Sequence, residues 1–295
     1  MLNKIYEKIK KFILENYKFM IILIVLVFTF TYEFPYVVYT PGGIVNLEKR
    51  IDVEKKVEKK GSLNMSYVTL RKGNIPSILL SFVIPDWDLL KESEVTIDDE
   101  SVDDLLKMEK LYMTSSIDNA TILAYKKANK EIKITNNVNN VIYIDDLAKT
   151  DVQVYDQIIS VDGNNISDIN DLKKYISTKN ENDIVYFKVK TKASESGSSG
   201  GLMLSLAIYN SLIDEDITKG KKVVGTGTID INGNVGKIDG VKYKILGAVK
   251  NKADLFICPK ENYDEAIRVK KNHNLDIKII SVETFDEAIE YLNNN

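Results

Sequence analysis

The sequence predicts a mixed protein of the α+β or α/β class that follows a single N-terminal transmembrane helix. Three observations support this prediction. A charge-free apolar run lies near the N-terminus, short β-type runs alternate with helical patterns towards the C-terminus, and apolar residues make up 44% of the 295 residues. That apolar fraction is enough to form a buried core, and the length is enough for about two domains.

The first predicted element is the membrane helix. Residues 1–18 contain five lysines and two glutamates, and residues 19–32 contain no charged side chain. Because a full span needs about 20 residues, we place the anchor at residues 19–39, with aromatic residues at both ends and a snorkelling Lys18. A buried core helix and a cleaved signal peptide are the alternatives. The aromatic ends disfavour the first, and the lack of a small-x-small site after Thr31 disfavours the second.

The lysine distribution predicts the orientation of this anchor. The first basic residues after the apolar run are Lys49 and Arg50. The excess of lysine before the run predicts that residues 1–18 are a cytoplasmic segment and that the bulk of the chain is extracytoplasmic. The chain is therefore predicted to be a single-pass protein of the cell membrane. Its net charge of −3 gives no indication of a nucleic-acid partner.

The middle of the chain is predicted to contain two α/β parts. Residues 40–130 form an extracytoplasmic α/β region with strands at 66–70 and 78–83 and a helix over 101–130. Residues 131–190 form a smaller α/β unit with a tight turn at Asp162-Gly163. Its predicted elements are strands at 141–144, 157–161 and 184–189 and a helix at 168–176.

Residues 191–295 have the clearest pattern. A serine- and glycine-rich loop over 191–201 leads into a helix at 202–213 that is apolar on nearly every side and therefore buried. Capping pairs are predicted at Asn262 with Glu265 and at Thr284 with Glu287. The later elements are strands at 223–231, 255–258 and 276–282 and helices at 241–249, 262–271 and 284–292.

The rarest residues exclude several kinds of site. Cys258 is the only cysteine and His273 the only histidine. Cys258 lies in an apolar strand pattern that indicates core packing, and His273 lies in a polar turn that indicates the surface. The usual zinc site and an internal disulfide are therefore excluded. Gly236-Lys237 is followed by Ile238, which does not fit a Walker loop, so we expect no cofactor, no metal and no ATP.

Two local patterns are candidates for catalysis. The serine- and glycine-rich loop opens into a buried helix, whose unpaired N–H groups can stabilise an oxyanion beside a serine hydroxyl. Linkers have the same composition, so the loop alone is weak evidence. In the helix at 241–249, Lys242 and Lys244 both lie on or beside the apolar arc, so periodicity does not choose between them. Burial would lower the pKa of either amine towards that of a base, and the alternative is a pair of snorkelling lysines.

At these positions the residues match a family. Gly197 to Met203 resembles the nucleophile motif of Lon-type Ser–Lys proteases, G-P-S-A-G-[LI]-x. Thr226-Gly227-Thr228-Ile229, Gly233-x-Val235-Gly236 and Gly240 to Lys244 resemble three further motifs in the same order. The chain differs in having Ser198, Gly200 and Asp239 where the family has proline, alanine and glycine.

The resemblance implies roles for individual residues. Ser199 would be the catalytic nucleophile, and Lys244 rather than Lys242 would be the base. Thr226 would orient Lys244, and backbone N–H groups around Gly197, Ser198 and Gly200 would hold the oxyanion.

Three other segments, Tyr39 to Gly43, Tyr112 to Ala120 and Leu204 to Leu212, are similar to the membrane-anchored PDZ–Lon subgroup (YlbL/SepM type). The resemblance implies that residues 131–190 are a degenerate PDZ-like module and that residues 191–295 form a Lon-like proteolytic domain. It implies an ATP-independent serine endopeptidase that cleaves extracytoplasmic peptides or proteins. The stretch between Val189 and Gly197 is shorter than in the subgroup, and it supports the alternative of a catalytically inactive, membrane-anchored peptide-binding scaffold.

Overall fold

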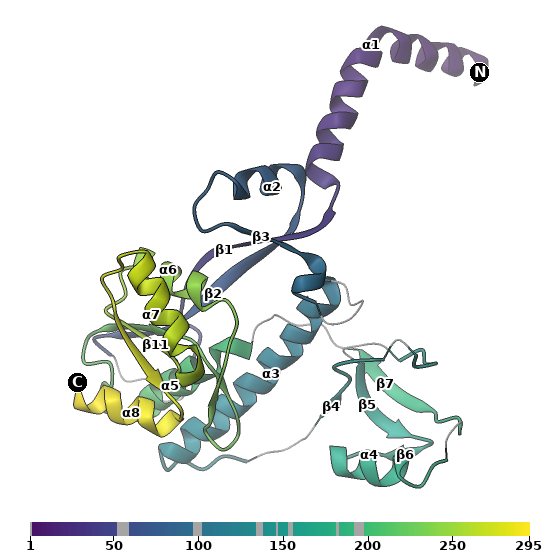
Figure 1. Cartoon of the computed structure of the whole chain (residues 1–295). Coiled ribbons are helices and arrows are strands. Elements are labelled where there is room, and N and C mark those ends of the chain that lie inside the picture. Colours follow the sequence, from purple (N-terminus) through teal and green to yellow (C-terminus); the bar gives the residue numbers. More distant parts are fainter. Residues whose placement is uncertain are drawn as a thin grey trace. The chain divides into compact units, whose positions relative to one another are not determined.

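The structure is a computed structural model that describes residues 2–51, 59–96, 102–133, 138–145, 147–152, 156–180, 183–191 and 198–295. The chain divides into two compact units (Figure 1). Unit 1 comprises Met1–Thr40 and Thr69–Asp99, and unit 2 comprises Pro41–Val68 and Glu100–Asn295.

Unit 1 is built on the long helix α1 and a strand pair. Strands β1 and β3 pair antiparallel, with Tyr36 opposite Lys91 and Tyr39 opposite Asp88. Residues Val37 and Val38 of β1 are fully buried. The elements of this unit are α1 (Leu2–Thr31), the start of β1 (Phe34–Asn46), the end of β2 (Ser62–Gly73), α2 (Ile75–Ser81), β3 (Asp88–Lys91) and the short helix η1 (Glu92–Glu94).

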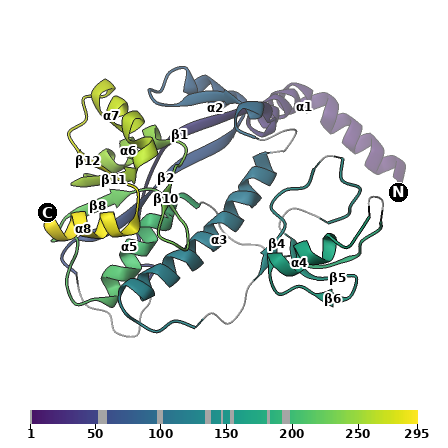
Figure 2. The same ribbon diagram turned by 60° about the horizontal axis from the view of Figure 1, so that its bottom comes forward.

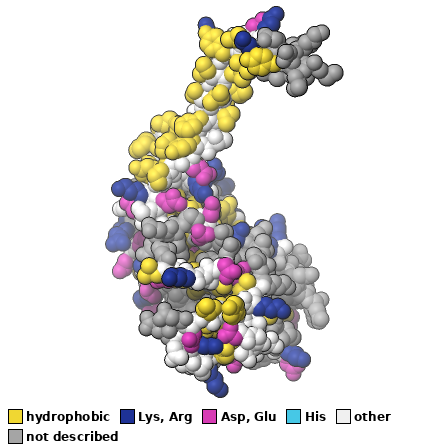
Figure 3. Space-filling model, turned by 90° about the vertical axis from the view of Figure 1, so that its right-hand side faces the viewer, with side chains coloured by type: hydrophobic (Ala, Val, Ile, Leu, Met, Phe, Trp, Pro, Cys, Tyr) yellow, Lys and Arg dark blue, Asp and Glu magenta, His cyan; other side chains and the backbone are white. Residues whose placement is uncertain are grey.

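Helix α1 contains the apolar run that the sequence indicates. Within the described residues, Lys10–Thr31 is the one helical stretch long and apolar enough to cross a membrane, and none of it is buried inside the structure. Hydrophobic side chains cover much of α1 on the face that Figure 3 shows. The predicted end of the anchor at residue 39 is corrected, because the apolar residues from Phe34 onwards form strand β1 instead.

The strand predicted at 78–83 is wrong, because this segment forms helix α2 and the turn after it. The Asn74 side chain accepts a hydrogen bond from the backbone N–H of Ser77, and the Ser77 hydroxyl accepts one from the N–H of Asn74. Such a reciprocal cap satisfies two N–H groups at a helix start. Pro76 fits the first turn of a helix, where no N–H is needed. The cap at Asn74 therefore favours a helix, although the apolar composition of residues 78–83 is typical of a strand.

Unit 2 contains a parallel sheet covered by helices on both faces. Its strands follow the order β2-β8-β11-β12, and each neighbouring pair is parallel. Figure 2 shows α6 and α7 on one side of these strands and α5 and α8 on the other. The elements that build this part are α3 (Val102–Lys127), α5 (Gly201–Leu212), β8 (Lys222–Gly225), α6 (Val241–Lys250), β11 (Leu255–Pro259), the short helix η3 (Lys260–Asn262), α7 (Tyr263–Asn272), β12 (Lys278–Val282) and α8 (Phe285–Asn294).

Alternating side chains of the strands form two separate cores. Val223 and Leu255 belong to a core shared with α3, α5 and α8. The next residues along, Val224 and Phe256, belong to a second core shared with α6 and α7. Successive strand residues point to opposite faces of a sheet, and a parallel sheet with both faces covered is typical of α/β architecture. The mixed α/β prediction is confirmed.

The elements predicted in the C-terminal part are present, with two differences. The strand predicted over 223–231 is divided into β8 and β9 (Thr228–Ile229), and β9 pairs antiparallel with β10 (Val235–Gly236). The break contains Gly227, whose φ of 153° favours glycine. Thr284 caps α8 as predicted, whereas the Asn262 side chain does not cap α7. It bonds the backbone N–H and carbonyl of Ile238 instead, at 2.9 and 2.8 Å.

The two rare residues lie where the sequence placed them. Cys258 is fully buried in β11, and His273 is exposed at the end of α7. Burial raises the pKa of the Cys258 thiol to about 12. Core packing of this cysteine is therefore confirmed.

Residues 138–191 contain a small antiparallel sheet and one helix. Strand β5 pairs with β4, β6 and β7. The strand predicted at 141–144 is displaced to residues 139–140, while the strand at 157–161 and the helix at 168–176 are confirmed within a residue. The elements are β4 (Asn139–Asn140), β5 (Asp156–Val161), β6 (Asn164–Asn165), α4 (Ile169–Ile176) and β7 (Phe187–Thr191).

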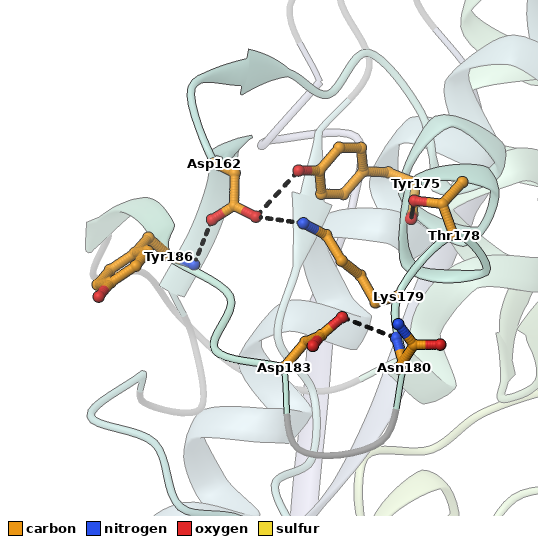
Figure 4. Close-up of polar contacts among 7 residues, drawn as sticks. All are labelled: Asp162, Tyr175, Thr178, Lys179, Asn180, Asp183 and Tyr186. Atoms are coloured by element: carbon orange, nitrogen blue, oxygen red, sulfur yellow. Dashed lines mark hydrogen bonds and ion pairs between the residues drawn. The ribbon is translucent and has the colours of Figure 1, made fainter.

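The predicted turn after β5 is held by a polar cluster that Figure 4 shows. The Asp162 carboxylate accepts hydrogen bonds from the backbone N–H of Tyr186 at 2.8 Å and from the Tyr175 hydroxyl and the Lys179 amine, both at 2.9 Å. These bonds, the Tyr186 N–H first, lower the pKa of Asp162. Positive φ angles at Asp162 and Gly163 confirm the tight turn. The cluster joins β5, α4 and the start of β7, and the PDZ-like identity of this part stays a prediction.

Candidate active site

The loop that carries Ser199 forms the short helix η2 (Ser198–Gly200), which leads directly into α5. The carbonyl of Ser199 accepts hydrogen bonds from the backbone N–H of Gly227 at 2.8 Å and from the hydroxyl of Thr226 at 2.9 Å. In the opposite direction, the N–H of Leu202 donates to the carbonyl of Gly227 at 3.0 Å. The backbone of Ser199 is therefore fixed at a helix start by the segment that joins β8 to β9.

Two glycines let neighbouring elements approach this loop closely. A Cβ atom on Gly200 would collide with the sulfur of Met65 in β2, and one on Gly201 would collide with the Ser116 hydroxyl of α3. The same Cβ on Gly201 would lie 2.7 Å from a methyl group of Ile229. The Met65 sulfur therefore occupies the space that an alanine side chain at residue 200 would use, and an alanine there would require Met65 to change its conformation.

Helix α3 supports the loop from the other side. The hydroxyl of Ser116 donates to the carbonyl of Ser198 at 3.1 Å, and the side-chain amide of Asn119 donates to the carbonyl of Ile229 at 3.2 Å. Ala120 is fully buried on the same helix. The segment from Tyr112 to Ala120, singled out by its sequence, thus contributes Ser116 to the support of the Ser199 loop and Asn119 to the support of β9.

Helix α6 places Lys244 in the protein interior. The helix begins after Gly240, whose φ of +69° is the left-handed conformation that favours glycine. Lys244 follows one turn later and is only 4% exposed, whereas Lys242 is partly exposed. The structure therefore distinguishes the two lysines that periodicity left equivalent, and Lys244 is the buried one.

Burial changes the protonation of Lys244. Loss of hydration lowers the pKa of its amine from 10.5 to about 8, and nearby carboxylates oppose this shift. The change corresponds to about 3 kcal/mol in favour of the neutral amine. At pH 7, about a tenth of such amines are neutral, against roughly one in 3,000 for an ordinary lysine. Lys244 is thus a far better general base than a hydrated lysine.

Glu109 of α3 links the two halves of this site. Its carboxylate accepts a hydrogen bond from the backbone N–H of Ser198, and it lies close enough to Lys244 for each charge to shift the pKa of the other group. Burial raises the pKa of Glu109, while the Ser198 bond and the Lys244 charge lower it. One carboxylate therefore contacts the loop of Ser199 and acts electrostatically on Lys244.

Glu109 was not among the residues predicted from the sequence, because a single glutamate on a helix is ordinarily a surface residue. Its spacing was an available signal. Glu109 lies seven residues before Ser116, and residues separated by seven share one face of a helix.

Asp239, which replaces a glycine of the family pattern, is a second carboxylate that raises the pKa of Lys244. It is exposed, so solvent weakens its effect.

Most of the predicted site residues come together in unit 2. Ser198, Ser199 and Gly200 form the loop, and Thr226 is fully buried beneath it. Thr226 holds the backbone of Ser199, and its predicted role in orienting Lys244 stays a prediction. Gly197 lies outside the described residues. Within the described part of the chain, no group of three histidine, cysteine, aspartate or glutamate side chains is placed to hold a metal ion.

Comparison with known proteins identifies the family of this region. Residues 158–294 match the model of the Lon protease (S16) C-terminal proteolytic domain. The match begins at Ile158, inside the part predicted to be PDZ-like, and it includes the Ser199 loop and α6.

Individual relatives agree with the family match. The chain is 31% identical over 96 residues to the Lon protease of Campylobacter jejuni and 33% identical over 95 residues to that of Campylobacter concisus. It is 28% identical over 122 residues to the archaeal Lon protease of Archaeoglobus fulgidus. These alignments cover 32%, 32% and 41% of this chain but only 12%, 12% and 19% of the relatives. The protein is thus a mixed α/β chain that carries a Lon-type (S16) proteolytic domain.

Proposed function

We propose that this protein is an ATP-independent serine endopeptidase that uses Ser199 as nucleophile and Lys244 as general base. The observation that supports this most strongly is the buried amine of Lys244, whose pKa is lowered to about 8. Glu109 accepts a hydrogen bond from the Ser198 N–H in the loop of Ser199, and it lies close enough to that amine for its charge to raise the pKa of Lys244. A hydrated surface lysine has no comparable capacity to accept a proton at neutral pH.

In the proposed reaction, the neutral amine of Lys244 takes the hydroxyl proton as the Ser199 oxygen bonds to the peptide carbonyl carbon. Backbone N–H groups at the start of α5 stabilise the negative oxygen that forms. The N–H of Ser198 is already donated to Glu109, so Ser199 and Gly200 are the better oxyanion donors. The protonated Lys244 then gives its proton to the leaving amine, and water releases the acyl group from Ser199.

The anchor and domain organisation are part of the same proposal. Helix α1 is proposed to hold the chain in the cell membrane, with residues 1–18 in the cytoplasm and the remainder outside. Residues 40–130 are proposed as the extracytoplasmic α/β region, residues 131–190 as a PDZ-like module that binds peptide, and residues 191–295 as the proteolytic region. The apolar stretch Lys10–Thr31 of α1 and the excess of lysine within residues 1–18 support this arrangement.

Because the protease proposed here acts without an unfoldase, flexible peptides and unstructured segments are expected to be its substrates. The purified full chain, reconstituted in vesicles, should cleave a reduced and alkylated protein but leave the folded form intact, and added ATP should not change the rate. Mass spectrometry of the products measures both outcomes. Peptide binding without any cleavage would instead support the inactive scaffold.

The rate of peptide cleavage is expected to rise with pH and to be half-maximal near pH 8, because only the deprotonated Lys244 is a base and its pKa is about 8. The measurement is kcat/KM for one peptide between roughly pH 5.5 and pH 10, a range that includes the pKa of Lys244. A rate that falls across this range would contradict a lysine base.

Glu109→Gln should move this profile to lower pH. The glutamate charge raises the pKa of Lys244, and a glutamine oxygen still accepts the bond from Ser198 N–H without carrying charge. Asp239→Asn is the matched control, and it should give a smaller shift because Asp239 is exposed. If the parent chain and Glu109→Gln cleave at equal rates at high pH but the variant keeps its activity to lower pH, Glu109 is a positioning residue that acts through Lys244. An unmoved profile would show that its charge does not reach the amine.

A further inference from the structure

An exposed apolar segment lies in unit 1. Residues 73–85 contain no charged side chain, and they form α2 and the turn after it. Four large side chains of this segment are exposed, Leu79 by 60%, Leu80 by 42%, Phe82 by 74% and Val83 by 78%. An exposed apolar cluster of this kind is typical of a surface that binds another protein or a membrane.

This segment is attached to the end of α1. The side-chain amide of Asn74 donates to the carbonyl of Phe30 at 3.1 Å, one of the last carbonyls of α1, which have no partner within the helix. The carbonyl oxygen of the same side chain caps α2 by accepting from Ser77 N–H at 3.0 Å. Lys72 forms an ion pair with Glu33 at 3.3 Å, just after α1. Figure 1 shows α2 beside the C-terminal end of α1.

Several backbone N–H groups of the segment donate to carbonyls of the segment itself. The N–H groups of Phe82, Val83 and Ile84 donate to the carbonyls of Leu79 and Leu80, and the hydroxyl of Ser81 donates to the carbonyl of Ile78. Pro76 and Pro85 have no N–H group to satisfy. Each paired N–H group lowers the cost of entering the boundary of a bilayer. The segment therefore combines exposed apolar side chains with paired N–H groups in the turn after α2.

We propose that residues 75–84 are a second membrane contact, which inserts Leu79, Leu80, Phe82 and Val83 into the lipid surface at which α1 leaves the bilayer. The proposal depends on the anchoring of the chain by α1. The occupant is lipid because the segment is charge-free and the residue before it, Asn74, is hydrogen-bonded to the last turn of α1. Charged residues lie on both sides of it, Arg71 and Lys72 before and Asp86 and Asp88 after, which fits a boundary between lipid and water.

Such a contact would fix the orientation of the β1–β3 strand pair against the membrane. A single helix leaves the attached unit free to rotate about the helix axis and to tilt. A second contact at the same surface removes most of that freedom, because both the end of α1 and the 75–84 segment must stay in the lipid boundary. Unit 1 then acts as a rigid support at the membrane.

The test uses the full chain with one added cysteine, labelled with an environment-sensitive fluorophore and reconstituted in phosphatidylcholine vesicles. Cys258 stays unlabelled, because it is fully buried and its pKa is raised to about 12. With Phe82→Cys, the emission should be blue-shifted and should be quenched by doxyl-labelled phosphatidylcholine to the same degree as with Leu26→Cys in α1. Val83→Cys should repeat this result, and Lys271→Cys, at an exposed charged position of α7, should show neither effect.

Three other outcomes would overturn the proposal. Quenching at residue 26 without quenching at 82 and 83 would show that α1 is in the bilayer and that the segment is not. A blue shift at 82 without lipid quenching would show that protein covers the segment, as in an association of two copies of this chain. Absence of quenching at residue 26 as well would remove the anchoring by α1, and the second contact with it.

Discussion

Replacing Ser199 by alanine is expected to lower kcat/KM for peptide cleavage by at least about 1,000-fold, since removal of a nucleophile leaves only the contribution of binding and oxyanion stabilisation. The fold should be unaffected, because the hydrogen bonds that hold this residue end on its backbone carbonyl. Thermal unfolding of the variant should therefore match that of the parent chain.

Ser198→Ala is the matched control for this experiment. Ser198 is the adjacent serine of the same short helix, and its structural bonds use its backbone N–H and carbonyl. Its loss should change kcat/KM by no more than about threefold, a small effect on the scale of a nucleophile. Activity that survives Ser199→Ala but is lost in Ser198→Ala would move the nucleophile by one residue, and activity that survives both changes would show that neither serine is the nucleophile.

Lys244→Met is expected to reduce cleavage by about 1,000-fold or more, because the Ser199 hydroxyl then has no base. Methionine fills a similar volume without an amine. Because the burial of an ionised amine is costly, the variant should unfold at an equal or higher temperature than the parent. A loss of activity together with retained stability would separate a role in catalysis from a role in folding.

Lys242→Met is the matched control for Lys244→Met, because Lys242 lies two residues earlier in the same helix. Lys242 is partly exposed, and its loss should leave kcat/KM nearly unchanged. Peptide binding, measured by fluorescence anisotropy, should persist in both lysine variants. If Lys242→Met abolishes cleavage and Lys244→Met does not, the base is Lys242 and the assignment drawn from burial is wrong.

The charges around Lys244 determine how much of its amine is neutral before substrate binds. Burial favours the neutral amine, while Glu109 and Asp239 favour the protonated one. With a pKa of about 8, most molecules at neutral pH hold a protonated Lys244, and the neutral form that is proposed to act as the base is the minority. Loss of the Glu109 charge would increase that minority, so the shift of the pH profile measures how strongly this carboxylate limits activity near pH 7.

Local sequence determined the helices α1, α5 and α6, the alternating elements at the C-terminus and the turn at Asp162-Gly163. Each is specified by neighbouring residues, through an unbroken apolar run, a helical period or a residue pair that favours a turn. The same local information reduced the candidate bases to two lysines of one helix. It also placed Ser199 at the start of a buried helix, where N–H groups are unpaired.

Only the tertiary structure decided which lysine is buried, and it introduced Glu109 as a carboxylate that raises the pKa of that lysine. Both results depend on how α3 and α6 pack within unit 2, because these helices are more than 100 positions apart in the sequence. The helix at residues 75–81 was also missed, because it depends on a cap at Asn74 that outweighs a strand-like composition. Burial and charge arise from packing between distant segments, and no window of local sequence contains them.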